Sequence, residues 1–464
     1  GEERFHRALK HYLEVNRGKN VVTADFVKAV EESSYASVQQ FFNQWVYGAG
    51  APKYEVGYTY DDRKHQVALT VKQTQKAEGR VGIFTMPVDV EITTSAGSHL
   101  YPITVAKQVE TFSLPASSAP LMVLFDKGGH ILKTAEVHKE KKEWLYQLKN
   151  AAELSDRADA AVALKTFKEK DDEVINALGD AALNDKAWGV RATAADSLGA
   201  LGGPQAAKKV LAALDAAKEP WLRSRLVAAL GNFKDDKEVL ARLPVIAEQD
   251  NAYRARAAAL QALGKLKSPD AFRILNAAIT ADSPDDFLRN AALRALGPLG
   301  DDKAVPVLSS WSAIGKPMPT REAAIASLAR QQKDNKEITR QIAAYLSEPH
   351  FPVRMAALFA LGGRGDATAI PALEEMLKSN DLSIEMTPMI KAQIAKLKRP
   401  AKEKPEAHAQ AGADDDEDEE SADSNAGGEK NHSVVVDRLD KLEHLLEEMN
   451  GRLKAMETRL PAKP

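Results

Sequence analysis

The chain has 464 residues, which at roughly 150 residues per domain predicts about three domains. Its 63 Lys and Arg against 66 Asp and Glu give a formal net charge of −3, and this balance argues against a generally basic nucleic-acid-binding protein. The sequence has no cysteine, which excludes a disulfide framework, thiolate metal ligands and a cysteine nucleophile. No apolar run approaches the roughly 18 residues of a membrane-spanning helix.

The first segment, residues 2–46, predicts helices. Apolar side chains recur at helical spacing at Phe5, Leu9 and Leu13. The run Gly48-Ala49-Gly50-Ala51-Pro52 ends this segment, because glycine and proline together interrupt regular structure strongly.

From residue 54 to about residue 137 the apolar period changes to two. Several short alternating runs separated by turns such as Ala96-Gly97-Ser98 predict a small β-sandwich. Pro87, at the start of the third run, predicts an edge strand because proline cannot donate a hydrogen bond to a sheet. The alternating positions are Tyr54, Val56, Tyr58 and Tyr60; Val67, Leu69 and Val71; Val88, Val90 and Ile92; Phe112 and Leu114; and the run Leu121–Phe125.

From about residue 144 to residue 397 the chain is helical and repeats itself. An arginine with a leucine seven residues later recurs at intervals of 34, 32, 33, 33, 32 and 33 residues. Seven copies at one period predict an α-solenoid that resembles short HEAT-like repeats, in which each helix pair buries its apolar face against its neighbours. The pairs are Arg157/Leu164, Arg191/Leu198, Arg223/Leu230, Arg256/Leu263, Arg289/Leu296, Arg321/Leu328 and Arg354/Leu361.

Each repeat carries further regular positions. The third residue after the arginine is alanine or leucine, which predicts close packing between helices. A glycine follows the leucine in five units, as expected of a helix C-cap: Gly199, Gly231, Gly264, Gly297 and Gly362. The seven arginines suggest either an anion-binding row or a structural one, in which a carboxylate or helix-end carbonyl of a neighbouring repeat holds each of them. The structural interpretation is favoured, because the solenoid has too small an excess of bases for electrostatic binding.

The last part of the chain differs in composition. From Ala401 onward there are 17 acids and 9 bases, a net of −8, whereas the preceding residues carry a net of +5. Residues 400–432, with the acidic run Asp414–Glu420, predict a disordered linker. Residues 433–460 have a heptad seam, with leucine at one core position, and predict a coiled coil that self-associates or pairs with a partner helix. The seam is Val435, Leu439, Leu442, Leu446, Met449, Leu453, Met456 and Leu460.

The sequence offers no catalytic constellation, so we predict no catalytic, cofactor-binding or metal-binding residue in this chain. Among the histidines only His6 and His11 lie close together, five residues apart and without the H-E-x-x-H spacing of a zinc site. Gly362-Gly363-Arg364-Gly365 is glycine-rich but has no preceding strand, as a nucleotide-binding loop requires.

The N-terminal half contains a series of local motifs. They are Gly1-Glu2-Glu3-Arg4-Phe5, Tyr12-Leu13, Thr23-Ala24-Asp25-Phe26, Phe41-Phe42-Asn43-Gln44-Trp45, Gly50-Ala51-Pro52 and Tyr54-Glu55-Val56. Together with the order of helices, sandwich and solenoid, these motifs resemble the M1 family of zinc aminopeptidases. The resemblance implies a multidomain fold: the α-helical end of a thermolysin-like domain over 1–50, a β-sandwich over 51–140 and a HEAT-like α-solenoid over 145–398. The linker and the coiled coil depart from the family pattern.

The resemblance also implies a function. The family's zinc ligands, in H-E-x-x-H, and its G-x-M-E-N motif would lie upstream of Gly1. We therefore expect a C-terminal fragment of a peptidase that removes N-terminal residues from peptides, bound to zinc in the full-length parent and inactive alone. The alternative is a non-enzymatic scaffold of HEAT repeats that self-associates through the coiled coil. Neither nucleic acid nor a membrane segment is expected, and both an exported bacterial protein and a cytoplasmic one are compatible with the sequence.

Overall fold

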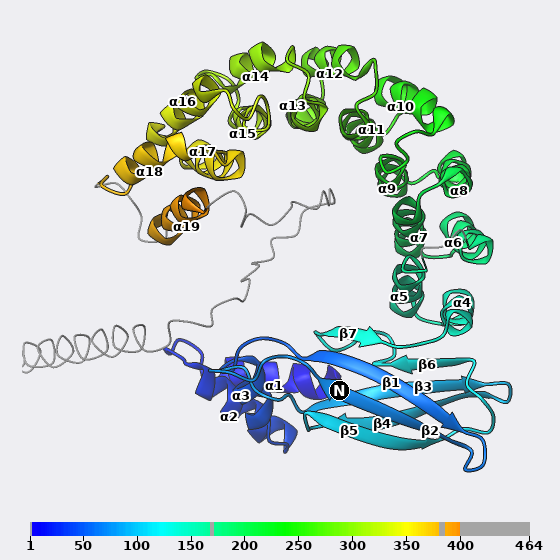
Figure 1. Ribbon diagram of the computed structural model, residues 1–464. Coiled ribbons are helices and arrows are strands. Elements are labelled where there is room, and N and C mark those ends of the chain that lie inside the picture. Colours follow the sequence, from blue (N-terminus) through cyan, green and yellow to red (C-terminus); the bar gives the residue numbers. More distant parts are fainter. Residues whose placement is uncertain (1, 168–170, 380–385, 400–464) are drawn as a thin grey trace, which may run out of the picture. The chain divides into compact units, whose positions relative to one another are not determined.

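The computed structural model describes residues 2–167, 171–379 and 386–399 (Figure 1). The predicted acidic linker and coiled coil lie outside these ranges. The described residues form three helices, two small β-sheets and then a long series of paired helices. The expected order of a small sheet region followed by a helical solenoid is therefore confirmed. No helix in the described ranges is both long and apolar enough to span a membrane.

The three N-terminal helices are α1 (Glu2–Val15), α2 (Thr23–Ser34) and α3 (Gln39–Trp45). Their contact is centred on Phe26, whose ring lies 5.0 Å from that of Tyr12 and 6.0 Å from that of Phe42. The α3 helix is tied to the sheet region, because the Gln44 Oε1 accepts a hydrogen bond of 2.8 Å from the Thr85 amide.

The seven strands form two sheets, with strand orders β5-β2-β1-β7 and β4-β3-β6. Valine, leucine and isoleucine at alternate positions of β1, β2 and β3 point inward and form one shared apolar core, for example Val56, Leu69 and Val90. Two sheets that pack on one apolar core in this way form a β-sandwich. The strands are β1 (Lys53–Asp61), β2 (Gln66–Gln73), β3 (Met86–Thr94), β4 (Gly97–Val105), β5 (Val109–Pro115), β6 (Met122–Phe125) and β7 (Thr134–Val137).

The edge-strand prediction from Pro87 is wrong. The β3 strand lies in the middle of its sheet, between β4 and β6. Pro87 is nevertheless accommodated, because β6 pairs only with residues 90–93, so that β4 is the one neighbour of β3 at Pro87. A proline is tolerated where one side of the strand has no partner.

The helices after residue 140 form two layers (Figure 1). The odd-numbered helices α5 to α17 make the inner layer, where each one packs against the next, and the even-numbered helices α4 to α18 make the outer layer. The helices are α4 (Lys141–Asn150), α5 (Leu154–Leu164), α6 (Asp172–Asn184), α7 (Trp188–Leu201), α8 (Pro204–Ala216), α9 (Pro220–Leu230), α10 (Lys237–Gln249), α11 (Tyr253–Leu266), α12 (Ala271–Thr280), α13 (Phe287–Leu299), α14 (Ala304–Ser312), α15 (Met318–Leu328), α16 (Lys336–Ala344), α17 (Phe351–Arg364), α18 (Ile370–Met376) and α19 (Met386–Lys398), with short 3₁₀ turns η1 (Pro284–Asp286), η2 (Tyr345–Ser347) and η3 (Ala367–Ala369).

The repeat positions read from the sequence lie in the inner layer. The seven leucines and the seven residues three positions after the arginines are all completely buried, as in Leu263 and Ala259 of α11. Burying one leucine contributes about 1.5–3 kcal/mol to folding, so the repeated leucines supply much of the apolar stabilisation of the stack.

The glycines that follow the leucines were predicted to be helix C-caps, and only Gly231 is one. Four of the five lie inside their helices, and Gly231, which does end α9, has a φ of −63° rather than a left-handed one. Each instead lies where a neighbouring element comes close. A Cβ at Gly264 would stand 2.2 Å from the Ala295 carbonyl oxygen of α13, and one at Gly199 would stand 2.8 Å from Asn232 Nδ2. These positions lack a side chain because the next repeat occupies the space.

This close approach predicts the effect of a single methyl group. Gly264→Ala forces α11 away from α13 and should lower the free energy of unfolding by about 1–3 kcal/mol. The control is Gly189→Ala in α7, where nothing lies within 4 Å of the added Cβ, so the alanine should be neutral or should stabilise by about 0.5–1 kcal/mol. Urea unfolding followed by circular dichroism measures both. Equal stability of the two variants would contradict the packing role.

Candidate functional site

The histidines do not assemble a metal site in the described ranges. His11 Nε2 lies 3.0 Å from Glu32 Oε2, across the contact between α1 and α2, and His6 does not join them in a cluster. No group of three His, Asp or Glu able to hold a metal ion occurs among the described residues. His408, His432 and His444 lie outside them.

The seven repeat arginines form a row of structural contacts, which we call the arginine ladder. Every member donates at least one hydrogen bond to a carboxylate or to a main-chain carbonyl near a helix end, which supports the structural interpretation. Four of them, Arg157, Arg191, Arg223 and Arg321, reach a carboxylate of the next repeat as predicted, whereas the acceptors of Arg256, Arg289 and Arg354 lie just before their own helices. The acceptors are Asp185, Ala151 and Ala152 for Arg157; Glu219 for Arg191; Asp250, Leu214 and Ala217 for Arg223; Ala247 for Arg256; Asp286 and Ile279 for Arg289; Ser312 and Glu348 for Arg321; and Glu348 for Arg354.

Arg157 shows the geometry most fully. Its Nε and Nη2 donate to the two oxygens of Asp185 at 2.7 and 3.0 Å, and its Nη1 donates to the carbonyls of Ala151 and Ala152. The carbonyls belong to the loop before its own helix, and Asp185 belongs to the loop before the next inner helix, α7. One guanidinium therefore fastens two successive loops of the solenoid.

Arg321 and Glu348 form a similar pair that is almost fully buried, with both side chains less than a tenth exposed. The hydrogen bond from Arg321 holds the pKa of the Glu348 carboxyl below its ordinary value, against the opposing effect of burial. With both charges engaged in this way, the ladder offers no free guanidinium at this position for a ligand.

A cluster of polar groups joins the sandwich to the first helices of the solenoid. The Tyr58 hydroxyl of β1 donates to the Glu143 carboxylate of α4, and the Gly128 amide donates to Asp156 of α5 at 3.1 Å. The Lys139 ammonium donates to the Gln147 side chain and lies 4.3 Å from the centre of the Trp144 ring. Burial raises the pKa of Tyr58, and that of Asp156, and lowers the pKa of Lys139 to about 8.

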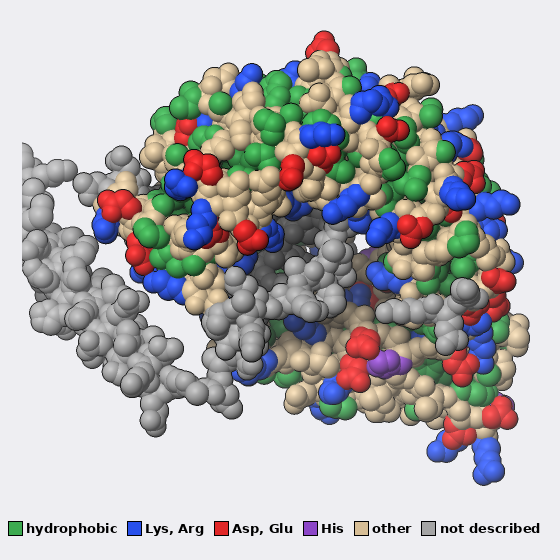
Figure 2. All heavy atoms as spheres, turned by 45° about the horizontal axis from the view of Figure 1, so that its top comes forward, with side chains coloured by type: hydrophobic (Ala, Val, Ile, Leu, Met, Phe, Trp, Pro, Cys, Tyr) green, Lys and Arg blue, Asp and Glu red, His purple; other side chains and the backbone are tan. Residues whose placement is uncertain are grey.

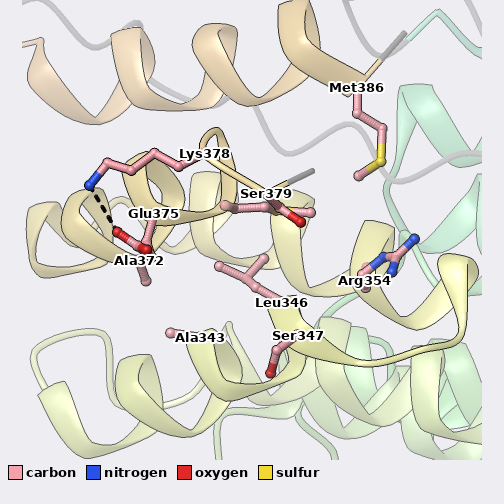
Figure 3. A pocket seen from close by; sticks show the side chains of 10 residues that line it. Ala343, Leu346, Ser347, Arg354, Ala372, Glu375, Lys378, Ser379 and Met386 are labelled. Atoms are coloured by element: carbon pink, nitrogen blue, oxygen red, sulfur yellow. Dashed lines mark hydrogen bonds and ion pairs between the residues drawn. The ribbon is translucent and has the colours of Figure 1, made fainter. Parts of the chain in front are cut away.

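Two larger pockets lie in the C-terminal half of the solenoid. The first, of about 460 Å³, is lined by residues of α16, α17, α18, α19 and η2 (Figure 3). Its charged groups are already engaged: Lys378 pairs with Glu375 at 2.9 Å, and Arg354 donates to the Glu348 carbonyl. Two of its lining residues, Ser379 and Met386, flank in sequence a stretch outside the described ranges, and we assign no site to this pocket.

The second pocket, of about 660 Å³, is a groove along the C-terminal halves of three inner helices, α13, α15 and α17. Its lining includes three bases, Lys267, Arg330 and Lys333, and no acid. None of the three forms an ion pair within the described ranges. The remaining lining is small or apolar, with Pro298 and the half-exposed Phe359 as its largest apolar groups.

Glycines shape this basic groove. A Cβ at Gly297 would stand 3.1 Å from Arg330 Cδ, so the arginine stem runs across the surface of α13 at that point. A Cβ at Gly300 would stand 3.8 Å from the Lys267 Nζ. A base from the preceding inner helix and one from the following inner helix therefore meet at the end of α13.

The sequence analysis did not identify the groove cations. Arg330 stands nine residues after ladder residue Arg321, and Lys267 follows Arg256 by eleven. The repeat pattern does contain a signal for Arg330. The residues nine positions after three ladder arginines, Pro298, Arg330 and Gly363, all line the groove. Neither base belongs to a local motif.

The buried pair predicts a large effect of one substitution. Arg321→Met leaves the Glu348 carboxylate buried without its partner and should lower the free energy of unfolding by about 3–5 kcal/mol. Because the folded-state pKa of Glu348 is depressed, its contribution is present above the unfolded pKa and is lost as pH falls, so the difference from the unchanged protein should shrink below about pH 4.

The control for Arg321→Met is Arg340→Met. Arg340 pairs with Glu337 at 2.9 Å, but both side chains are more than 70% exposed, so the loss should stay below about 1 kcal/mol. Urea unfolding at pH 7 and pH 4 measures both variants. Similar losses for the two at pH 7 would contradict the importance of burial.

The polar cluster predicts a pH dependence above neutrality. Because burial lowers the pKa of Lys139 to about 8, the unfolded chain binds more protons than the folded one between that pH and the pKa of a free lysine, and stability rises with pH there. Lys139→Met should flatten this rise between about pH 8 and pH 10. Lys142→Met, at an exposed residue paired with Glu140, should leave the rise unchanged. Identical pH profiles for the unchanged protein and Lys139→Met would refute this assignment.

This chain is similar to a known protein in sequence and to a solved structure in fold. A stretch of 74 residues is 32% identical to aminopeptidase N from Haemophilus influenzae, and it covers 16% of this chain and 8% of that protein. The fold is similar to the crystal structure of Legionella pneumophila aminopeptidase A in complex with aspartic acid, with a TM-score of 0.61 and 15% sequence identity. This similarity covers 85% of this chain and 55% of the Legionella protein, so the chain spans about half the length of that structure.

The sequence of the solenoid matches a known family of repeats. The family described as HEAT repeats matches residues 142–231, 208–297, 240–329 and 316–385. The predicted HEAT-like nature of the solenoid is thus confirmed, and the matched residues together make up more than half of the 464-residue chain. The chain belongs to the HEAT-repeat family.

Proposed function

We propose that this chain is the C-terminal part of an M1-type zinc aminopeptidase, in which the sandwich and the solenoid support and cover a catalytic domain. The aminopeptidase similarities in sequence and fold support a peptidase-related origin. The motifs between Gly1 and Val56 that resemble the M1 family point in the same direction.

The surface of α1, α2 and α3 carries this proposal. These helices and their flanking residues bury only four apolar side chains, Ala8, Val27, Ala29 and Phe42. They leave exposed nine large ones: Phe5, Leu13, Val15, Val21, Val22, Tyr35, Phe41, Val46 and Tyr47. An apolar surface of this density usually marks a contact, and it fits helices that complete a larger domain.

In this proposal the zinc ion would be bound by the preceding catalytic domain and not by this chain. The described residues do not fit a zinc site, since they bring together no three suitable ligands. We therefore assign no step of peptide hydrolysis to them. Their part is to pack against the catalytic domain and to shape access to it, and the peptide substrate is proposed for the whole protein.

The alternative function, a HEAT-repeat scaffold without catalysis, is favoured by a different observation. Large apolar side chains are exposed in the first turn of every inner helix from α5 to α17, one for each repeat. Such a row suits the binding of a partner along the solenoid. It comprises Leu154, Trp188, Trp221, Tyr253, Phe287, Met318 and Phe351.

Two proteins discriminate between these functions: the present chain, and the product of the natural reading frame extended upstream of Gly1. We expect the longer protein to hydrolyse aminoacyl p-nitroanilides in a manner abolished by a zinc chelator and restored by zinc. The present chain should not hydrolyse them. A longer product without zinc-dependent turnover, or turnover by the present chain, would contradict the proposal.

The same pair of proteins tests the role of the exposed surface. Leu13→Ser should leave the thermal stability of the present chain unchanged, because Leu13 is 66% exposed there. In the longer protein it should lower stability by about 1–3 kcal/mol, since the leucine would be buried against the catalytic domain. Ala8→Ser, at a residue already buried, is the control and should affect both proteins.

A further inference from the structure

We propose that the basic groove on α13, α15 and α17 binds an acidic, extended polypeptide segment. This surface lies within the solenoid, and the inference does not depend on the peptidase function proposed above. The argument rests on the charge of the groove, its apolar floor and its length.

The charge of the groove is one-sided. Lys267, Arg330 and Lys333 line it without an acidic neighbour in the lining, and none of them is paired within the described ranges. Elsewhere in the solenoid most arginines are engaged, as Arg225 is with Asp196 and Arg242 with Asp215. Asp302, two residues after the lining residue Gly300, accepts a hydrogen bond from the Gln332 side chain and is not part of the lining. Three unpaired bases complement carboxylates.

The floor of the groove favours a polypeptide over nucleic acid. Phe359 and Pro298 lie among alanines and glycines, a surface suited to an apolar side chain of a peptide. A nucleic acid would need a longer basic surface to neutralise its phosphates. On the face shown in Figure 2, basic side chains are interspersed with acidic and apolar ones, and no continuous basic stripe extends across it.

The length of the groove sets the size of the ligand. The axes of α11 and α15 are two helix-packing intervals apart, but the Lys267 and Arg330 side chains both reach over α13. A Cβ at Gly300 would stand 3.8 Å from the Lys267 Nζ and one at Gly297 3.1 Å from the Arg330 Cδ, and positions three residues apart on a helix are about 5–6 Å apart, so the two cationic groups lie within roughly 15 Å of each other. An extended chain rises about 3.3 Å per residue. Two acidic groups about four residues apart, with an apolar residue between them, would therefore reach both bases and Phe359.

The test uses the full chain and a fluorescein-labelled decapeptide with three glutamates at each end and one phenylalanine between them. A second preparation has Asn and Gln in place of the acids at 414–420, so that this run cannot compete with the probe. Fluorescence anisotropy should show binding that weakens with salt. The double variant Arg330→Glu/Lys333→Glu should weaken it by about tenfold or more.

Two matched controls separate the groove from general effects. Lys208→Glu/Lys234→Glu changes the net charge equally, at exposed residues outside the groove, and should alter affinity by less than about twofold. Phe359→Ala should weaken binding, whereas Phe351→Ala, at an equally exposed residue of the same helix outside the groove, should not. Thermal unfolding verifies that all variants are folded.

The outcomes are distinct. Selective loss in the groove variants supports the proposal. Equal losses in the two double variants, or binding of a decapeptide with lysines in place of glutamates, would overturn it. Tighter binding of a ten-nucleotide oligothymidylate than of the glutamate peptide would assign the groove to nucleic acid instead. The proposal would also be refuted if the glutamate peptide bound neither to the full chain nor to the preparation changed at 414–420, both with an intact groove.

Discussion

In four of its seven repeats the solenoid depends on the contact between an arginine of one repeat and a loop of the next. Arg157, Arg191, Arg223 and Arg321 each donate to a carboxylate that lies 27 or 28 residues further along the chain. Asp185 and Asp250 each accept, in addition, the amide two residues ahead. A single carboxylate thus fixes the turn into an inner helix and its distance from the preceding repeat. Leucine and alanine supply the apolar stabilisation, but they do not specify this spacing.

Much of this arrangement could be predicted from the sequence, because the residues that define it lie close together in each repeat. Arginine, a residue three positions on and leucine recur within one helix, so their period reveals the solenoid without knowledge of any neighbour. The glycines were misassigned for the opposite reason. Whether Gly264 ends a helix or makes room for another depends on the Ala295 carbonyl, which lies 31 residues away in sequence and 2.2 Å from the Cβ that an alanine would add.

Features that depend on residues distant in sequence were also missed in the sheets and in the groove. The β4 strand buries only Ile103 and Val105, at its end, and β7 buries no residue, so neither carries a long apolar run that would mark it as a strand in the sequence. Pro87 indicated an edge because the sequence does not show that β6 stops short of it. Lys267 and Arg330 come from different repeats and meet only because α11, α13 and α15 are stacked.

Contacts that join only neighbouring units leave the length of the whole unconstrained. Nothing in the arginine ladder connects its first member to its last, and each carboxylate serves only the adjoining loops. A unit of about 33 residues could therefore be gained or lost by duplication or deletion with only one junction to be remade. The span of the inner layer is thus open to evolutionary change in single steps, while the geometry of every remaining repeat is preserved.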